Sequence, residues 1–177
     1  MRRIGTTVVA MALALGGVAA AQQPAAAQVR FIHDKAGDSK GGFGDIKRVR
    51  IGHAAKWVYL RATPHKGSFL GDFDDYWIDT VKRNPGPEYV VTTDTDYGNW
   101  FQVRRSKRFG HYGKVVCEGK VHLVPKTREY RFRVKRACLG KPARLRVSAH
   151  TIDGSGDPRF GDWAPGKKRF GPWVKRL

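Results

Sequence analysis

Cysteine is scarce in this sequence, because Cys117 and Cys138 are the only thiols among 177 residues. Neither belongs to a CxxC pair, so the sequence gives no support to zinc binding or to dithiol redox catalysis. Hydrolase motifs are absent too: the sequence has no GxSxG, HExxH or SxxK pattern, and its histidines are dispersed along the chain. These absences predict a protein that is not an enzyme and that carries no catalytic residue or cofactor, and they assign no metal ligand.

Long apolar runs are missing everywhere except near the N-terminus. Arg2 and Arg3 precede an uncharged stretch rich in Val, Leu and Ala, and small residues then offer cleavage sites after Ala21 or Ala27. We favour Ala27, because Pro24 ends the apolar helix and presents an extended segment to the signal peptidase. The alternative is a membrane anchor, but the run is short for that purpose and glycines interrupt it.

The expected product is an exported protein. We predict a secretory signal peptide at 1–27 and one domain at 28–177, with no membrane span of its own and a location that is extracellular or associated with the cell wall. A chain of this length buries about 70% of its unfolded surface, which suffices for one core. Hydrophobic residues make up 41% of the sequence and aromatic residues 11%, which is typical of a globular domain.

Acidic residues are few. Cleavage after Ala27 removes two of the 34 basic residues, so 32 remain against 15 acidic residues, and the formal net charge is +17. Such a charge attracts extracellular polyanions, including teichoic acids, acidic polysaccharides, anionic lipid and released nucleic acid. Sequence-specific nucleic-acid binding is not predicted, because on one strand Trp100 and Arg104 face away from Phe101 and Arg105.

Strand patterns dominate the rest of the sequence, and no long amphipathic helix is evident. Short runs of β-forming residues alternate with turns rich in Gly, Asn and Pro, which is typical of a sandwich or a barrel. We predict an all-β fold, a single-domain antiparallel β-sandwich with one disulfide. The expected strands lie at 29–33, 46–53, 56–63, 76–80, 88–94, 100–105, 114–118, 120–124, 129–135 and 143–152.

The two cysteines are expected to form that disulfide, since an even number of thiols in an exported protein favours pairing. A Cys117–Cys138 bond closes a loop of twenty intervening residues. It stabilises the fold by about 3 kcal/mol, chiefly by restricting the unfolded chain. The alternative is two separate buried thiols.

Alternating basic and apolar residues in two late segments predict a cationic sheet face. The segments 129–135 and 143–152 are expected to pair through the turn at 139–142, with Phe132, Val134, Leu145 and Val147 towards the core. A polyanion or polysaccharide would then bind on the opposite side. The alternative is a solvated face without a ligand. The expected binding residues are Arg131, Arg133, Lys135, Arg144 and Arg146.

Carboxylates form two clusters in the basic sequence. Asp72, Asp74, Asp75 and Asp79 are candidate calcium ligands, or the acid and base of a small extracellular hydrolase, with Asp72 and Asp74 expected in a loop. Asp34, Asp38 and Asp45 lie in a Gly-rich segment that could wrap a cation. The alternative for both clusters is turn formation and ion pairing with the surplus of basic residues.

Several short motifs occur in a fixed order: Asp34-Lys35-Ala36-Gly37-Asp38, Gly44-Asp45-Ile46, Trp77-Ile78-Asp79-Thr80, Arg136-Ala137-Cys138-Leu139-Gly140 and Asp162-Trp163-Ala164-Pro165. Together they resemble a family of small secreted actinobacterial proteins of unassigned activity. More remotely, the D-x-x-G-D opening, the strand ending in I-D-T and the late L-G turn resemble β-sandwich domains of the family 9 carbohydrate-binding, DOMON-like type. That second resemblance implies a sandwich that binds sugars on aromatic platforms.

Taken together, the patterns predict a secreted, non-catalytic module that binds anionic or carbohydrate surfaces or associates with the cell envelope. The alternative is a small hydrolase that uses the acidic cluster around Asp75. A purely cationic surface protein without a discrete ligand is a third possibility. The C-terminal segment from 162 to 173 is expected to be irregular, with its aromatic rings packed over an open end of the sandwich.

Overall fold

The computed structural model describes residues 27–177 except 40–43, 67–72, 96–97 and 153–160. The predicted signal peptide, apart from Ala27, lies outside the described residues, and so does Asp72. Within the described residues, no helix has the length and apolar character needed to cross a membrane.

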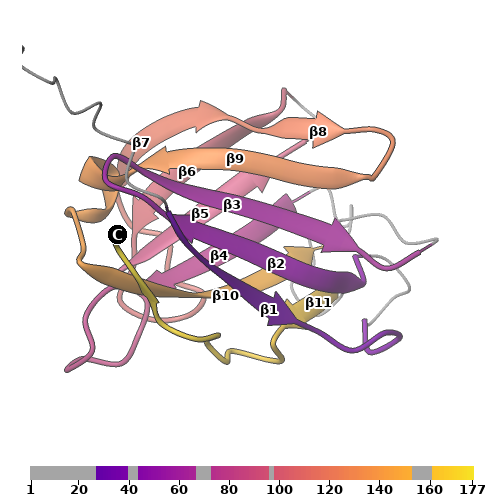
Figure 1. Cartoon of the computed structure of the whole chain (residues 1–177), viewed down its shortest axis with the longest axis horizontal. Helices are drawn as coiled ribbons and strands as arrows, with labels where there is room; N and C mark the ends of the chain where they lie inside the picture. The colour runs from indigo at the N-terminus through magenta and orange to yellow at the C-terminus, as the bar shows by residue number, and fades with distance from the viewer. Residues whose placement is uncertain (1–26, 40–43, 67–72, 96–97, 153–160) are drawn as a thin grey trace, which may run out of the picture.

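Two antiparallel sheets form the fold, as predicted. The first, called sheet A, has the strand order β1-β2-β3-β9-β8, and Figure 1 shows these strands side by side in front of the second sheet. Its strands are β1 (Gln28–His33), β2 (Ile46–His53), β3 (Trp57–Pro64), β8 (His122–Val124) and β9 (Glu129–Lys135).

The second sheet, called sheet B, has seven strands and the order β11-β10-β4-β5-β6-β7, with β12 paired to β10. A short 3-10 helix, η1 (Arg136–Leu139), leads from β9 in sheet A towards β10 in sheet B. The strands of sheet B are β4 (Phe73–Asp79), β5 (Tyr89–Asp94), β6 (Trp100–Arg105), β7 (Val115–Lys120), β10 (Arg144–Ile152), β11 (Gly161–Ala164) and β12 (Val174–Lys175).

The core lies between the two sheets and is built from every second residue of their strands. Leu60 and Phe132 of sheet A meet Tyr76 and Phe101 of sheet B, and the Phe132 ring lies 5.0 Å from the Tyr76 ring and 5.4 Å from the Phe101 ring. Each buried side chain of this size contributes about 1.5–3 kcal/mol relative to exposure. The alternation predicted for 129–135 is confirmed, since Phe132 and Val134 are buried and the basic residues that alternate with them are exposed.

The disulfide between Cys117 and Cys138 is also confirmed, with a Cα–Cα distance of 5.9 Å. Cys117 belongs to β7 of sheet B, and Cys138 belongs to η1, directly after β9 of sheet A. The bond therefore links the two sheets on the side of the sandwich where β7 and β9 contact each other.

The structure corrects the predicted pairing of 129–135 with 143–152. β9 pairs with β3 and β8 in sheet A, whereas β10 pairs with β4, β11 and β12 in sheet B. The segment between them is η1 followed by Gly140 at a φ of 72°, which redirects the chain from one sheet to the other. Arg131, Arg133 and Lys135 therefore lie on a different sheet from Arg144 and Arg146.

The C-terminal segment also differs from its prediction. It contains the short strands β11 and β12, and its rings pack on the outer face of sheet B, away from the core between the sheets. Phe170 lies 5.2 Å from Phe109, and Trp163 stacks on His150 with their ring centroids 4.1 Å apart. These contacts give sheet B a second apolar layer, in which Trp77 is only 1% exposed.

Candidate functional site

Basic side chains gather on the outer face of sheet A, the side away from the core. Each follows or precedes a core residue of its own strand, as Arg50 lies between Val49 and Ile51, so the alternation of the strand directs it outwards. We call this surface the cationic face. It comprises Arg48, Arg50, Arg61, Arg131, Arg133 and Lys135.

The strand register places three of these arginines in one row. Arg50 of β2 is opposite Arg61 of β3, and Arg61 is opposite Arg131 of β9. Phe31 of β1 and His122 of β8 extend the row to both edges of the sheet. Adjacent strands are about 4.8 Å apart, so three guanidinium groups follow one another across about 10 Å of surface.

Glu129 is the only carboxylate at the described strand positions of this face. It lies 2.5 Å from Arg61 and 2.9 Å from Arg131, and it accepts a further hydrogen bond from the Thr63 hydroxyl. Burial alone would raise the pKa of Glu129, but the hydrogen bonds from Arg61 and Arg131 outweigh it and lower the pKa to about 2. Two arginines thus share one negative charge, and the row remains strongly positive.

Aromatic rings are interleaved with these cations. Phe31 is 43% exposed and Tyr59 is 37% exposed. Arg48 lies 5.9 Å from the centroid of the Phe31 ring, and Arg133 lies 4.6 Å from that of Trp57. The face can therefore offer both positive charge and ring surface to a ligand.

Three of the predicted binding residues belong to the cationic face and two do not. Arg131, Arg133 and Lys135 lie on β9, whereas Arg144 and Arg146 lie on β10 of the other sheet. Arg146 forms an ion pair with Asp79, and Arg144 is opposite Lys175 of β12.

Sequence reasoning missed three arginines of the face. Arg50 and Arg61 alternate with buried residues, as the basic residues of β9 do, and Arg48 precedes the buried Val49. This alternation was available in the sequence as a signal. The sequence contains no signal that β2, β3 and β9 are neighbouring strands.

The acidic cluster around Asp75 is dispersed over both faces of β4. Asp74 belongs to the strand, contrary to the loop that we expected, and its backbone carbonyl accepts a hydrogen bond from the hydroxyl of Thr93. Asp75 and Asp79 lie on the outer face of sheet B, as predicted from the alternation, but Asp79 pairs with Arg146. The cluster therefore does not form one site among the described residues.

Asp75 lines a pocket of about 390 Å³ together with Trp100, Arg104 and Tyr112. Burial raises the pKa of Asp75 to about 6, although Tyr112 and Thr92 donate hydrogen bonds to its carboxylate. Among the described residues that line this pocket, Asp75 is the only carboxyl group. A general acid and a general base therefore do not converge there.

The second carboxylate cluster includes a residue that the sequence did not suggest. Asp34 and Asp38 lie with Asp162, which is remote in the chain, and one oxygen of each falls within 4.8 Å of the others. Burial and the charges of Asp162, Asp38 and Asp45 raise the pKa of Asp34 to about 7. Asp45 accepts a hydrogen bond from the backbone N–H of Gly37, and Asp162 accepts one from the backbone N–H of Ile46. Both carboxylates therefore help to hold the backbone of this segment in its conformation.

Comparison with known proteins adds nothing to this geometry. The chain matches no family model, no curated protein and no solved structure. The resemblance suggested by its short motifs thus stays a prediction, and the chemistry of the cationic face carries the functional argument.

Proposed function

We propose that this protein is an exported, non-catalytic module that binds linear polyanions through the cationic face. The observation that carries the proposal is the row Arg50, Arg61 and Arg131, in which like charges lie directly opposite one another on neighbouring strands. Such neighbours repel each other and destabilise a sheet. A bound anion relieves that repulsion, and Glu129 relieves only part of it.

The geometry suits an extended ligand better than a small one. The row crosses three strands, and Arg48, Arg133 and Lys135 add charge on either side of it. A polymer with regularly spaced anionic groups can contact several of these cations at once. Export is part of the proposal, and it is supported by the N-terminal signal pattern and by the disulfide between Cys117 and Cys138.

The test is the salt dependence of binding to linear polyphosphate. A face variant, Arg50→Gln/Arg133→Gln/Lys135→Gln, removes three cations that form no ion pair among the described residues. Each phosphate that pairs with a cation of the protein releases counterions when the ligand binds. Because the variant makes fewer such contacts, we expect a weaker affinity and a shallower log-log slope of affinity against salt.

The matched control removes the same charge elsewhere. Lys82, Arg83 and Lys107 are exposed and lie in segments that flank strands of sheet B. Their replacement by Gln should leave the slope close to that of the wild type. Equal losses in both variants would mean that net charge alone governs binding and that the cationic face has no special role.

A further inference from the structure

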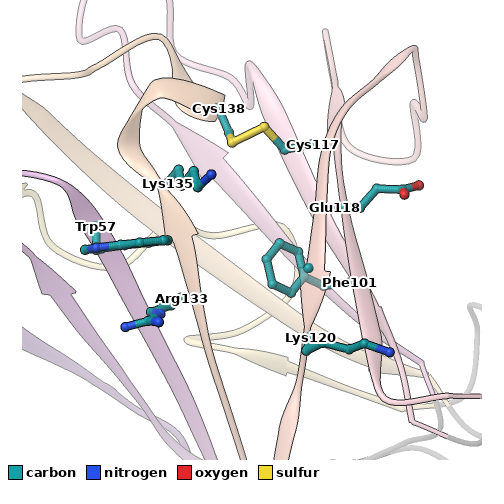
Figure 2. Close-up of a pocket in the computed structure, with 9 residues that line it drawn as sticks. Trp57, Phe101, Cys117, Glu118, Lys120, Arg133, Lys135 and Cys138 are labelled. Carbon is teal, nitrogen blue, oxygen red and sulfur yellow. A yellow bond between two sulfur atoms is a disulfide. The ribbon is translucent and has the colours of Figure 1, made fainter.

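The end of the cationic face at Trp57 borders two pockets. The first has a volume of about 360 Å³ and is lined by Trp57, Arg133, Lys135 and Lys120, beside the disulfide (Figure 2). Figure 2 shows Trp57 and Arg133 on one side of this pocket and Phe101 and Lys120 on the other. Two aromatic rings and the cations Arg133 and Lys135 therefore line one cavity, while the Lys120 ammonium points away from Trp57.

The second pocket has a volume of about 340 Å³. It is also lined by Trp57, but Arg133 is not among its lining residues. Lys56, Lys135 and Lys141 line it, and no carboxylate is among its described lining residues. Arg136 forms part of its wall, because its guanidinium donates hydrogen bonds to the backbone carbonyls of Ala55, Lys141 and Pro142. The lysines supply the positive charge that faces a ligand.

Hydrogen-bond acceptors are scarce across this whole surface. Both oxygens of Glu129 already accept hydrogen bonds from arginines of the face. Glu118 is the only carboxylate among the described residues that line the two pockets, and it accepts a hydrogen bond from Gln102. Lysine and arginine can only donate. The surface therefore suits a ligand that offers acceptors, and it would leave the hydroxyl donors of a neutral polysaccharide without partners.

Rings and cations together narrow the class of polyanion. Phosphate groups at neutral pH are anionic acceptors and pair well with arginine. Polyphosphate would use only the cations, whereas a ligand with flat apolar surfaces could also contact the exposed rings of Phe31 and Tyr59 and the ring of Trp57. Nucleobases provide such surfaces, and single strands expose them.

We propose that the cationic face binds single-stranded nucleic acid without sequence preference, with phosphates on Arg50, Arg133 and Lys135 and bases against Tyr59 and Trp57. This inference rests on the polyanion binding proposed above and specifies its ligand. Tyr59 is suited to stacking, because its ring lies beside the bare backbone of Gly52, where a Cβ would be 3.6 Å from the Tyr59 Cδ2, and the residue is still 37% exposed. Sequence preference is not expected, since every base has a face that stacks on an aromatic ring.

The test compares three ligands by fluorescence anisotropy: an oligothymidylate of about 15 nucleotides, linear polyphosphate and a sulfated polysaccharide. Trp57→Leu and Tyr59→Leu should each weaken oligonucleotide binding about 5- to 150-fold, which corresponds to the loss of one stacked base. Their effect on polyphosphate binding should be far smaller. Trp100→Leu, on the outer face of sheet B, is the matched control and should change neither affinity.

Two results would separate this inference from the proposed function. If polyphosphate binds and the ring variants bind the oligonucleotide like the wild type, polyanion binding stands and the nucleic-acid inference is overturned. A sulfated polysaccharide that binds more tightly than the oligonucleotide at equal salt would overturn it as well. If none of the three ligands binds, both proposals are wrong. Unchanged thermal unfolding of each variant would show that its fold is intact.

Discussion

Arg146 and Asp79 form an ion pair on the outer face of sheet B, with Arg146 Nη2 2.6 Å from Asp79 Oδ2. The carboxylate is fully buried, and the guanidinium lies 4.8 Å from the ring centroids of both Phe170 and Trp173. The pair therefore connects β4, β10 and the C-terminal segment. Arg146, which the sequence suggested as a ligand-binding residue, has a structural role here.

Replacing Arg146 should destabilise the fold. Arg146→Gln leaves the Asp79 carboxylate buried without its cation, so we expect the free energy of unfolding to fall by about 3–5 kcal/mol. Urea denaturation measures this change. The double variant Arg146→Gln/Asp79→Asn removes the buried charge and should recover much of the loss. A loss below about 1 kcal/mol in the single variant would contradict the structural role.

Much of the fold could be predicted from local patterns. The expected segments at 46–53, 100–105 and 129–135 coincide with β2, β6 and β9, because alternation and turn residues are properties of the neighbouring sequence. The short strands β11 and β12 were missed, since four and two residues carry too little periodicity.

The pairing of strands could not be predicted in the same way. We expected β9 and β10 to form a hairpin because they are adjacent in sequence, but η1 leads the chain from one sheet to the other. The row of Arg50, Arg61 and Arg131 joins strands that are far apart in the chain. Similarly, Asp79 and Arg146 are 67 residues apart, and no local pattern links them. The outward direction of each arginine was thus predictable, whereas its neighbours on adjacent strands were not.

Glu129 should limit the affinity of the cationic face. Glu129→Gln releases Arg61 and Arg131 for a ligand, so we expect polyphosphate to bind several-fold more tightly, with a log-log salt slope that is steeper by about one. The same variant should unfold at lower denaturant concentration, because the two arginines lose their shared partner. Fluorescence titration and urea denaturation measure the two effects. A weaker affinity in a variant that remains folded would argue against a ligand site on this row.

The stability of the fold should depend on the protonation of Asp34. Its pKa is raised from 3.8 to about 7 by burial and by Asp162, Asp38 and Asp45, so between these values the folded state retains a proton that the unfolded state releases. The contribution of Asp34 to stability therefore falls as pH rises from about 4 to about 7.

Asp34→Asn provides the measurement. Relative to the wild type, the melting temperature of this variant should rise as pH increases from 4 to 7 and change little above that range. Burial lowers the pKa of His150 to about 4, so this histidine contributes the opposite slope below its ordinary pKa of 6.5. It is present in both proteins, and its effect cancels in the difference. A difference that is constant across pH would contradict the raised pKa of Asp34.

We predict that the protein is exported and that its mature form begins at Gln28, with Gln22 as the second choice. β1 starts at Gln28, and the side-chain oxygen of this residue accepts a hydrogen bond from the backbone N–H of Lys175. Cleavage after Ala27 therefore leaves the first strand complete. Mass spectrometry of N-terminal peptides from the culture medium identifies the start, and recovery of an intact segment 1–27 there would refute the predicted cleavage.

The most direct test of the account is to observe the cationic face while a polyanion binds. NMR spectra of the side-chain Nε–H groups of arginine can be recorded during titration with linear polyphosphate at low salt. We predict that the signals of Arg50, Arg131 and Arg133 shift or broaden together, while those of Arg83 and Arg108 stay in place and the changes reverse at high salt. Shifts confined to residues outside sheet A, or spread equally over all arginines, would contradict a binding surface on the cationic face.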